Sequence, residues 1–123
     1  MSSDVLHSAL LSLIQSACES VLILVDQLPR ETLMRSRLTR GEVQRQLATV
    51  VASVAQVGPE QRAAMPEIDW SGWALMQGRL AGAPGEARDE ALWFACQSLV
   101  PATLLWLRVY QQSHPDLFHM TLA

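Results

Sequence analysis

The chain has 123 residues, of which 50% are hydrophobic and 17% are charged, and its formal net charge is −3. This length predicts one domain, spanning 1–123, with a core of its own. The acidic balance gives no overall attraction to nucleic acid or to an anionic membrane. Charged residues make up about a quarter of a typical domain, so we expect an oligomer to cover part of this surface.

Apolar residues recur at steps of three and four from Leu6 to Leu28, which predicts a first helix that ends before Pro29. A polar, basic linker follows. The pair Thr39 and Glu42 then predicts a second helix that begins with a capping box.

The second half of the chain predicts further helices. A short turn opens at Pro59, and a third helix runs from an Asp69 N-cap to Leu80. A fourth begins near Glu86 and is either kinked or restarted at Pro101. Residues 113–123 are expected to form a loose tail. The pattern contains no period-two strand, so we predict an all-α, up-and-down bundle of four or five helices.

Two cysteines, Cys18 and Cys96, lie in apolar helical patterns and have no partner at metal-ligand spacing. We expect free thiols in a reducing cytoplasm. The stretch MSSDVLHSALL lacks the basic residue of a signal peptide. The longest strongly apolar run, Val21–Val25, is far shorter than the roughly 20 residues that span a bilayer. We therefore expect a cytoplasmic protein without a membrane segment.

Several motifs follow one another in register between Leu38 and Pro101. They are LTRGEVQRQL, GPEQRAAM, PEIDW, MQGRLAGAP, Trp93 and the pair Val100-Pro101. In this order they resemble the HepT-like branch of the HEPN superfamily, which comprises small helical proteins of bacterial toxin–antitoxin pairs, once described as nucleotidyltransferase substrate-binding proteins. The resemblance covers 38–107 and implies a HEPN-like bundle that forms a homodimer.

The resemblance also implies a chemistry. Active members of the family cleave RNA without a metal or other cofactor, through an Arg-x-x-x-x-His motif at the dimer cleft. An arginine holds the scissile phosphate and its developing charge, and a histidine moves protons near neutral pH. In some members a tyrosine just after the histidine receives AMP from a partner nucleotidyltransferase, which silences the toxin.

All three functional positions are altered in MQGRLAGAP. Gln77 stands for the motif arginine, Gly82 for the histidine and Pro84 for the tyrosine. Arg79 remains at the place of a second, less critical arginine, and Val51-Ala52 replace a Gly-Glu pair that the family often has on the cleft side. The resemblance therefore predicts a scaffold that has lost ribonuclease catalysis.

Other residues offer no obvious replacement. None of His7, His114 and His119 follows an arginine at the motif spacing, and we expect no metal site. The five arginines between Arg30 and Arg45 either contact RNA phosphates or, as we favour, form a solvated helix start, because no aromatic residue interleaves with them.

Four tryptophans divide into two expected roles. Trp70 and Trp93 match family positions and are expected in the core. Trp73 and Trp106 depart from the family, and we name them as candidates for a dimer interface, where tryptophan is enriched.

These observations favour a homodimeric binding module. Its expected partner is a small nucleotidyltransferase of the antitoxin type, a nucleotide or RNA, and the candidates for its binding cleft are Arg45, Gln77 and Arg79. The alternative is an active, metal-independent RNA endonuclease with a non-standard site around Arg79. A structural or regulatory dimer without a ligand is the third possibility.

Overall fold

A computed structural model describes residues 3–118, and within them the side chains of 5–118. The elements are α1 (Ser3–Val25), α2 (Arg30–Arg35), α3 (Arg37–Gln56), α4 (Pro59–Ala64), α5 (Trp70–Leu80), α6 (Glu86–Phe94), a π-helical turn η1 (Ala95–Leu99), α7 (Val100–Ser113) and a 3-10 turn η2 (Pro115–Leu117). This part of the chain contains no strand, so the predicted all-α class is confirmed.

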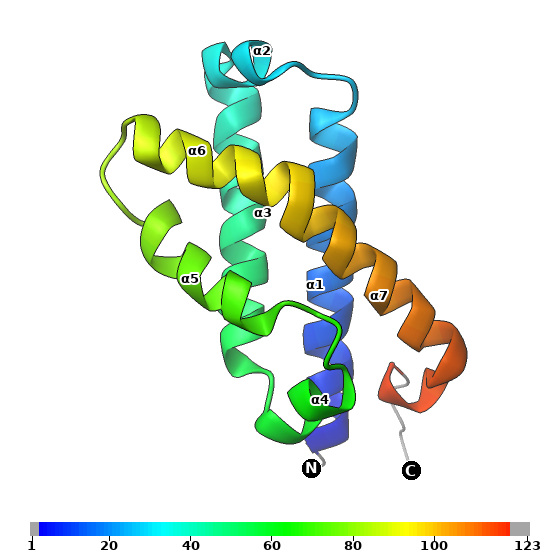
Figure 1. Ribbon diagram of the computed structural model, residues 1–123. Helices are drawn as coiled ribbons and strands as arrows, with labels where there is room; N and C mark the ends of the chain where they lie inside the picture. The colour runs from blue at the N-terminus through cyan, green and yellow to red at the C-terminus, as the bar shows by residue number, and fades with distance from the viewer. Residues whose placement is uncertain (1–2, 119–123) are drawn as a thin grey trace.

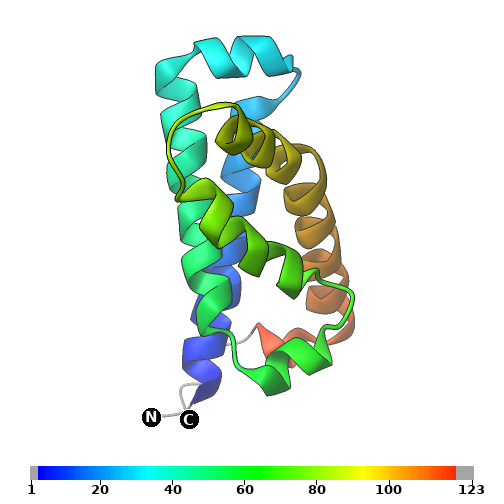
Figure 2. The same cartoon turned by 60° about the vertical axis from the view of Figure 1, so that its left-hand side comes forward.

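The long helices form two layers. Helices α1 and α3 lie side by side and antiparallel, and α5 and the continuous stretch from α6 to α7 cross one of their faces (Figure 1). In the turned view of Figure 2, α5 crosses in front of the α1–α3 pair and α7 runs along its right-hand side. The short helices α2 and α4 close opposite ends of the bundle. The molecule is therefore a helical bundle with two short connecting helices.

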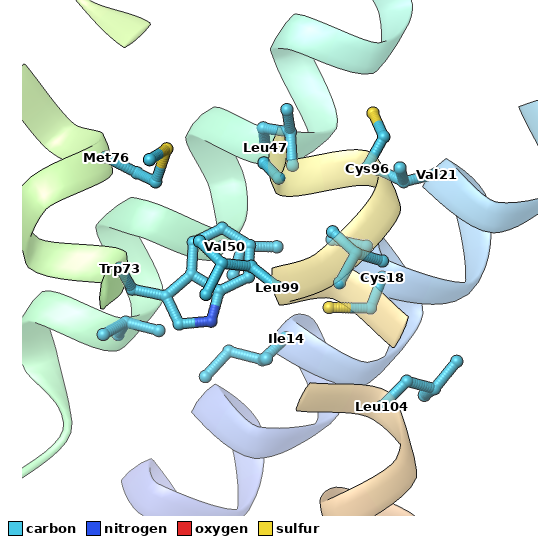
Figure 3. Packing of buried hydrophobic residues seen from close by; sticks show 14 of the residues in the cluster. Ile14, Cys18, Val21, Leu47, Val50, Trp73, Met76, Cys96, Leu99 and Leu104 are labelled. Atoms are coloured by element: carbon cyan, nitrogen blue, oxygen red, sulfur yellow. The ribbon is translucent and has the colours of Figure 1, made fainter. Parts of the chain in front are cut away.

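The core lies between these two layers. Every long helix contributes to it, because apolar residues at steps of three and four place one stripe inward. Its largest fully buried side chains include Leu11, Ile14, Val21, Leu47, Val50, Trp73, Leu92, Leu104 and Leu107. Figure 3 shows Trp73 of α5 beside Val50 and Leu99 in this cluster. Burial of one such aliphatic or aromatic side chain contributes roughly 1.5–3 kcal/mol.

Helix α3 begins earlier than the capping-box pattern predicts. Ser36 is the N-cap, and its hydroxyl accepts a hydrogen bond from the Thr39 amide at 3.4 Å. The Glu42 carboxylate pairs with Arg45 and Gln46. The predicted Thr39–Glu42 capping box is therefore wrong, because Ser36 supplies the same type of cap three residues earlier. The preceding segment, expected as a linker, contains helix α2.

The helix that includes Pro101 neither stops nor restarts. A proline lacks the backbone N–H and sterically opposes the carbonyl four residues earlier. The chain adopts the wider π-helical turn of η1 just before α7, which begins at Val100. Such a turn inserts an extra residue without ending the helix. The helix from Glu86 to Ser113 is therefore unbroken but bends at this turn (Figure 2), which is the kinked one of the two expected alternatives.

The tail is ordered for longer than expected. Ser113 is the last residue of α7, and η2 follows it. Leu117 and Phe118 pack against the core, and the Ser8 hydroxyl donates a hydrogen bond to the Leu117 carbonyl oxygen at 3.4 Å. The predicted loose tail is thus wrong up to Phe118, because these contacts hold the segment on α1. Residues 119–123 lie outside the described part.

Two helical stretches, Val5–Val25 and Glu86–Ser113, are long and apolar enough to cross a membrane by length and composition. The short run Val21–Val25 gave no sign of this, because polar residues interrupt the longer stretch. Both stretches bury one face in the bundle core. Core helices of bundles meet the same two criteria, so this property decides no compartment.

Candidate functional site

Helix α5 positions the Met76–Pro84 segment. The Asp69 carboxylate Oδ1 accepts a hydrogen bond from the Gly72 amide at 2.9 Å, which confirms the predicted N-cap. Trp73 and Met76 lie on the buried face of the helix. The remaining faces of its last turn carry the side chains that the sequence singled out.

The altered motif spans the last turn of α5 and the exposed loop that follows. The Ala81 amide donates to the Gln77 carbonyl at 3.3 Å, and the Gly82 amide donates to that of Arg79 at 3.4 Å. Gln77, Arg79 and Gly82 are exposed, as is Pro84. Position 77 is therefore on the last turn of α5 and carries an amide side chain, and position 82 is in the loop two residues after the helix and carries no side chain.

A first groove of about 240 Å³ lies between α3 and α5. We call it the α3–α5 groove, and it is lined by Gln44, Ala48, Val51, Ala52, Gln77, Leu80 and Ala81. The two altered sites, Val51-Ala52 and Gln77, thus share one surface depression. Its lining has no charged side chain, so it supplies neither a cation for a phosphate nor an acid–base group.

A second groove of about 480 Å³ lies between α5 and α6. We call it the α5–α6 groove, and it is lined by Met76, Arg79, Ala87, Glu90, Ala91 and Phe94. Arg79 therefore lies on a different side of α5 from Gln77. The side chain of Phe94 is 48% exposed although it is a large aromatic group.

The three cleft candidates do not come together. Arg45 is exposed on α3, forms an ion pair with Glu42 and lines neither groove. Gln77 lines the α3–α5 groove, and Arg79 lines the α5–α6 groove. Neither of the two grooves therefore joins all three.

The two histidines in the described part of the chain line neither groove. The His7 ring is near the start of α1, beside Gly58, and His114 follows α7 with its ring centroid 6.1 Å from that of Tyr110. His119 lies outside the described residues. Among the described side chains no group of three histidine, cysteine or acidic residues gathers where it could hold a metal ion.

The cysteines are buried and free. Burial raises the pKa of each thiol from 9.0 to about 12, and the neighbouring Glu19 carboxylate also raises that of Cys18. A neutral thiol is a poor nucleophile, because the thiolate is the reactive form. Both groups are therefore part of the apolar core and have no access to a substrate.

The tryptophans correct one interface candidate. Trp73 is fully buried, so it has no surface to offer to a second chain. Sequence spacing could not distinguish a core tryptophan from an interface one. Trp106 is half-buried and remains a candidate, and Trp70 and Trp93 pack against the core while partly exposed. Arg62 lies 5.9 Å from the Trp70 ring centroid.

Three of the five arginines from Arg30 to Arg45 have local partners. Arg35 lies 3.9 Å from Glu31, Arg45 pairs with Glu42, and Arg40 donates to the Met34 carbonyl oxygen. The solvated helix start, which we favoured over an RNA-binding patch, stays a prediction.

Comparisons with known protein families, with curated proteins and with solved structures find no match to the chain. The site is therefore defined by its own geometry, which consists of two grooves on either side of α5. The sequence singled out Gln77 and Arg79 but missed Phe94, whose place in a helical apolar pattern is that of a core residue.

Proposed function

We propose that the protein is a HepT-like HEPN protein of toxin–antitoxin type that has lost ribonuclease chemistry and acts as a homodimeric binding module in the cytoplasm. One observation carries this proposal. Position 77 lies exposed on the last turn of α5 and position 82 lies exposed in the loop just after it, yet they hold Gln77 and Gly82. An amide carries no positive charge for a phosphate, and a glycine moves no proton.

The surface supports an oligomer. Seven large apolar side chains outside the α5–α6 groove are 41–87% exposed, namely Leu6, Leu13, Ile23, Leu38, Leu75, Leu105 and Val109. Burying such groups against a second copy is favourable, and apolar area is concentrated in the core of homodimer interfaces. The uncharged α3–α5 groove adds to this surface.

The proposed partners are a small nucleotidyltransferase of the antitoxin type, a nucleotide or RNA. The altered motif bears on how the first of these would act. Pro84 has no hydroxyl at the position where the family's tyrosine receives AMP. A nucleotidyltransferase would therefore act here by binding and not by modifying this loop.

The test is incubation of the purified protein with RNA in the presence of a chelator, beside a light-scattering measurement of molar mass. We expect intact RNA and a mass of twice 13.6 kDa. The alternative, an endonuclease centred on Arg79, requires cleavage that disappears in Arg79→Ala. A monomer at every concentration would overturn the homodimer.

A further inference from the structure

We propose that the α5–α6 groove binds one nucleotide unit, with the Arg79 guanidinium on its phosphate and the Phe94 ring against its base. This inference rests on the proposed function and names the ligand site within it. The α5–α6 groove lies on the other side of α5 from Gln77. None of the altered positions Gln77, Gly82 and Pro84 belongs to its lining.

Arg79 supplies an available cation. Its side chain is exposed and lines the groove, and within the described part of the chain no ion pair or hydrogen bond engages its guanidinium. Arg35, Arg45 and Arg108 each have a carboxylate partner. A planar guanidinium with free donors matches two phosphate oxygens at once.

Phe94 supplies a stacking surface. It lies on the same face of α6 as Ala87 and Ala91, at steps of four and three residues. The two alanines leave the space beside the ring open. Every nucleobase has a flat face that stacks on an exposed aromatic ring, so this contact tolerates any base.

Glu90 completes the lining on α6. Its carboxylate forms no ion pair with Arg79 or with another described residue, so it is free to accept a hydrogen bond from a base amino group or a ribose hydroxyl. Its negative charge opposes a second phosphate. The volume of about 480 Å³ is within the range of small-ligand sites, roughly 300–1,000 Å³.

The ligand chemistry is therefore a base with a single adjacent phosphate. A free mononucleotide and one nucleotide of a single-stranded RNA both provide it. Two probes separate these sources, namely AMP in calorimetry and a fluorescein-labelled single-stranded RNA 12-mer in anisotropy, each with the full chain.

The variants are paired with controls. We expect Phe94→Ala to weaken binding by about tenfold and Phe94→Trp to retain it. We expect Arg79→Gln to weaken binding and to reduce the salt dependence of RNA binding by about 0.7 in slope, as loss of one single-strand phosphate contact does. Arg108→Gln, exposed on α7 and outside this groove, serves as the matched control for Arg79→Gln and leaves affinity unchanged.

Binding of AMP assigns the site to mononucleotides, and binding of RNA alone assigns it to a strand. The proposal is overturned if neither probe binds. It is also overturned if a probe binds Phe94→Ala and Arg79→Gln as tightly as it binds the natural protein. Failure of the proposed function is read separately from the light-scattering mass and the cleavage assay, which do not depend on this groove.

Discussion

The indole Nε1 of Trp73 donates a hydrogen bond to the Thr103 hydroxyl at 2.9 Å, and both residues are buried. The bond joins α5 to α7 across 30 positions of sequence. A buried indole N–H without an acceptor loses its hydration with no compensation. This pair therefore fixes how α5, and with it both grooves, lies on the bundle.

Replacement of Thr103 tests this bond. We expect Thr103→Val, which preserves shape but removes the acceptor, to lower the free energy of unfolding by about 1–3 kcal/mol. Thr103→Ser keeps the hydroxyl and serves as the control, with a smaller loss from the missing methyl group. Urea denaturation followed by tryptophan fluorescence measures both. Equal stability of the valine and serine variants would show that the bond contributes nothing.

We expect substitution by alanine to have opposite effects on stability at two glycines of α5. A Cβ at position 72 would lie 2.4 Å from the Asp69 Oδ2 atom, whereas nothing lies within 4 Å of one at position 78. Gly72→Ala therefore displaces the N-cap carboxylate, and we expect a loss of about 1 kcal/mol. Gly78→Ala improves helix propensity and is expected to gain roughly 0.5–1 kcal/mol.

Thermal denaturation of the two variants provides this comparison. Asp69→Ala is the reference for a lost cap, and Gly72→Ala in that background should cost little more, because the clash has gone. A stabilising Gly72→Ala would mean that the carboxylate moves aside without losing its hydrogen bond.

We expect the protein to lose stability in alkali because its two thiols are buried. Burial raises the pKa of Cys18 and of Cys96 to about 12 in the folded protein. Above the ordinary thiol pKa of 9.0 the unfolded chain binds fewer protons than the folded one. The free energy of unfolding therefore falls as pH rises from 9 towards 12, by at most about 1.4 kcal/mol per pH unit for each thiol.

The chain has no lysine and a single tyrosine, so few other groups titrate in the same pH range. Urea midpoints between pH 7 and pH 11 should be level at first and then decline. The double variant Cys18→Ala/Cys96→Ala should lack most of the decline. The same slope in that variant would assign the effect to other groups.

The helix boundaries predicted from the sequence were correct where only one nearby residue could cap or end the helix. The Asp69 cap, the end of α5 at Leu80 and the start of α6 at Glu86 were all correct. The predicted start of α3 was wrong because Ser36 and Thr39 can both cap a helix. The backbone conformation at Ser36, where α2 ends, decides between them.

The candidate site was partly visible in the sequence. Gln77 and Arg79 stood out from the motif, but their separation into two grooves depends on how α3 and α6 pack on either side of α5. Trp73 was expected at a dimer interface and is fully buried, because helical spacing marks an apolar face without showing how completely a neighbour covers it.

We propose a HEPN-like scaffold that is intact but has lost its chemistry, and restoring that chemistry in a variant tests this proposal. A Cβ at Gly82 would meet only the Arg79 carbonyl at 3.4 Å and the Gly78 carbonyl at 3.7 Å, which are ordinary contacts. Gln77 is exposed, so an arginine fits there as well.

The measurement is cleavage of RNA in chelator by the natural protein and by Gln77→Arg/Gly82→His, with Gln77→Arg/Gly82→Ala as the control that lacks the proton-transfer group. We predict that only the histidine-containing variant cuts, with a pH dependence near neutrality. Cleavage by the natural protein, or a folded dimeric histidine variant that leaves RNA intact, would contradict the account.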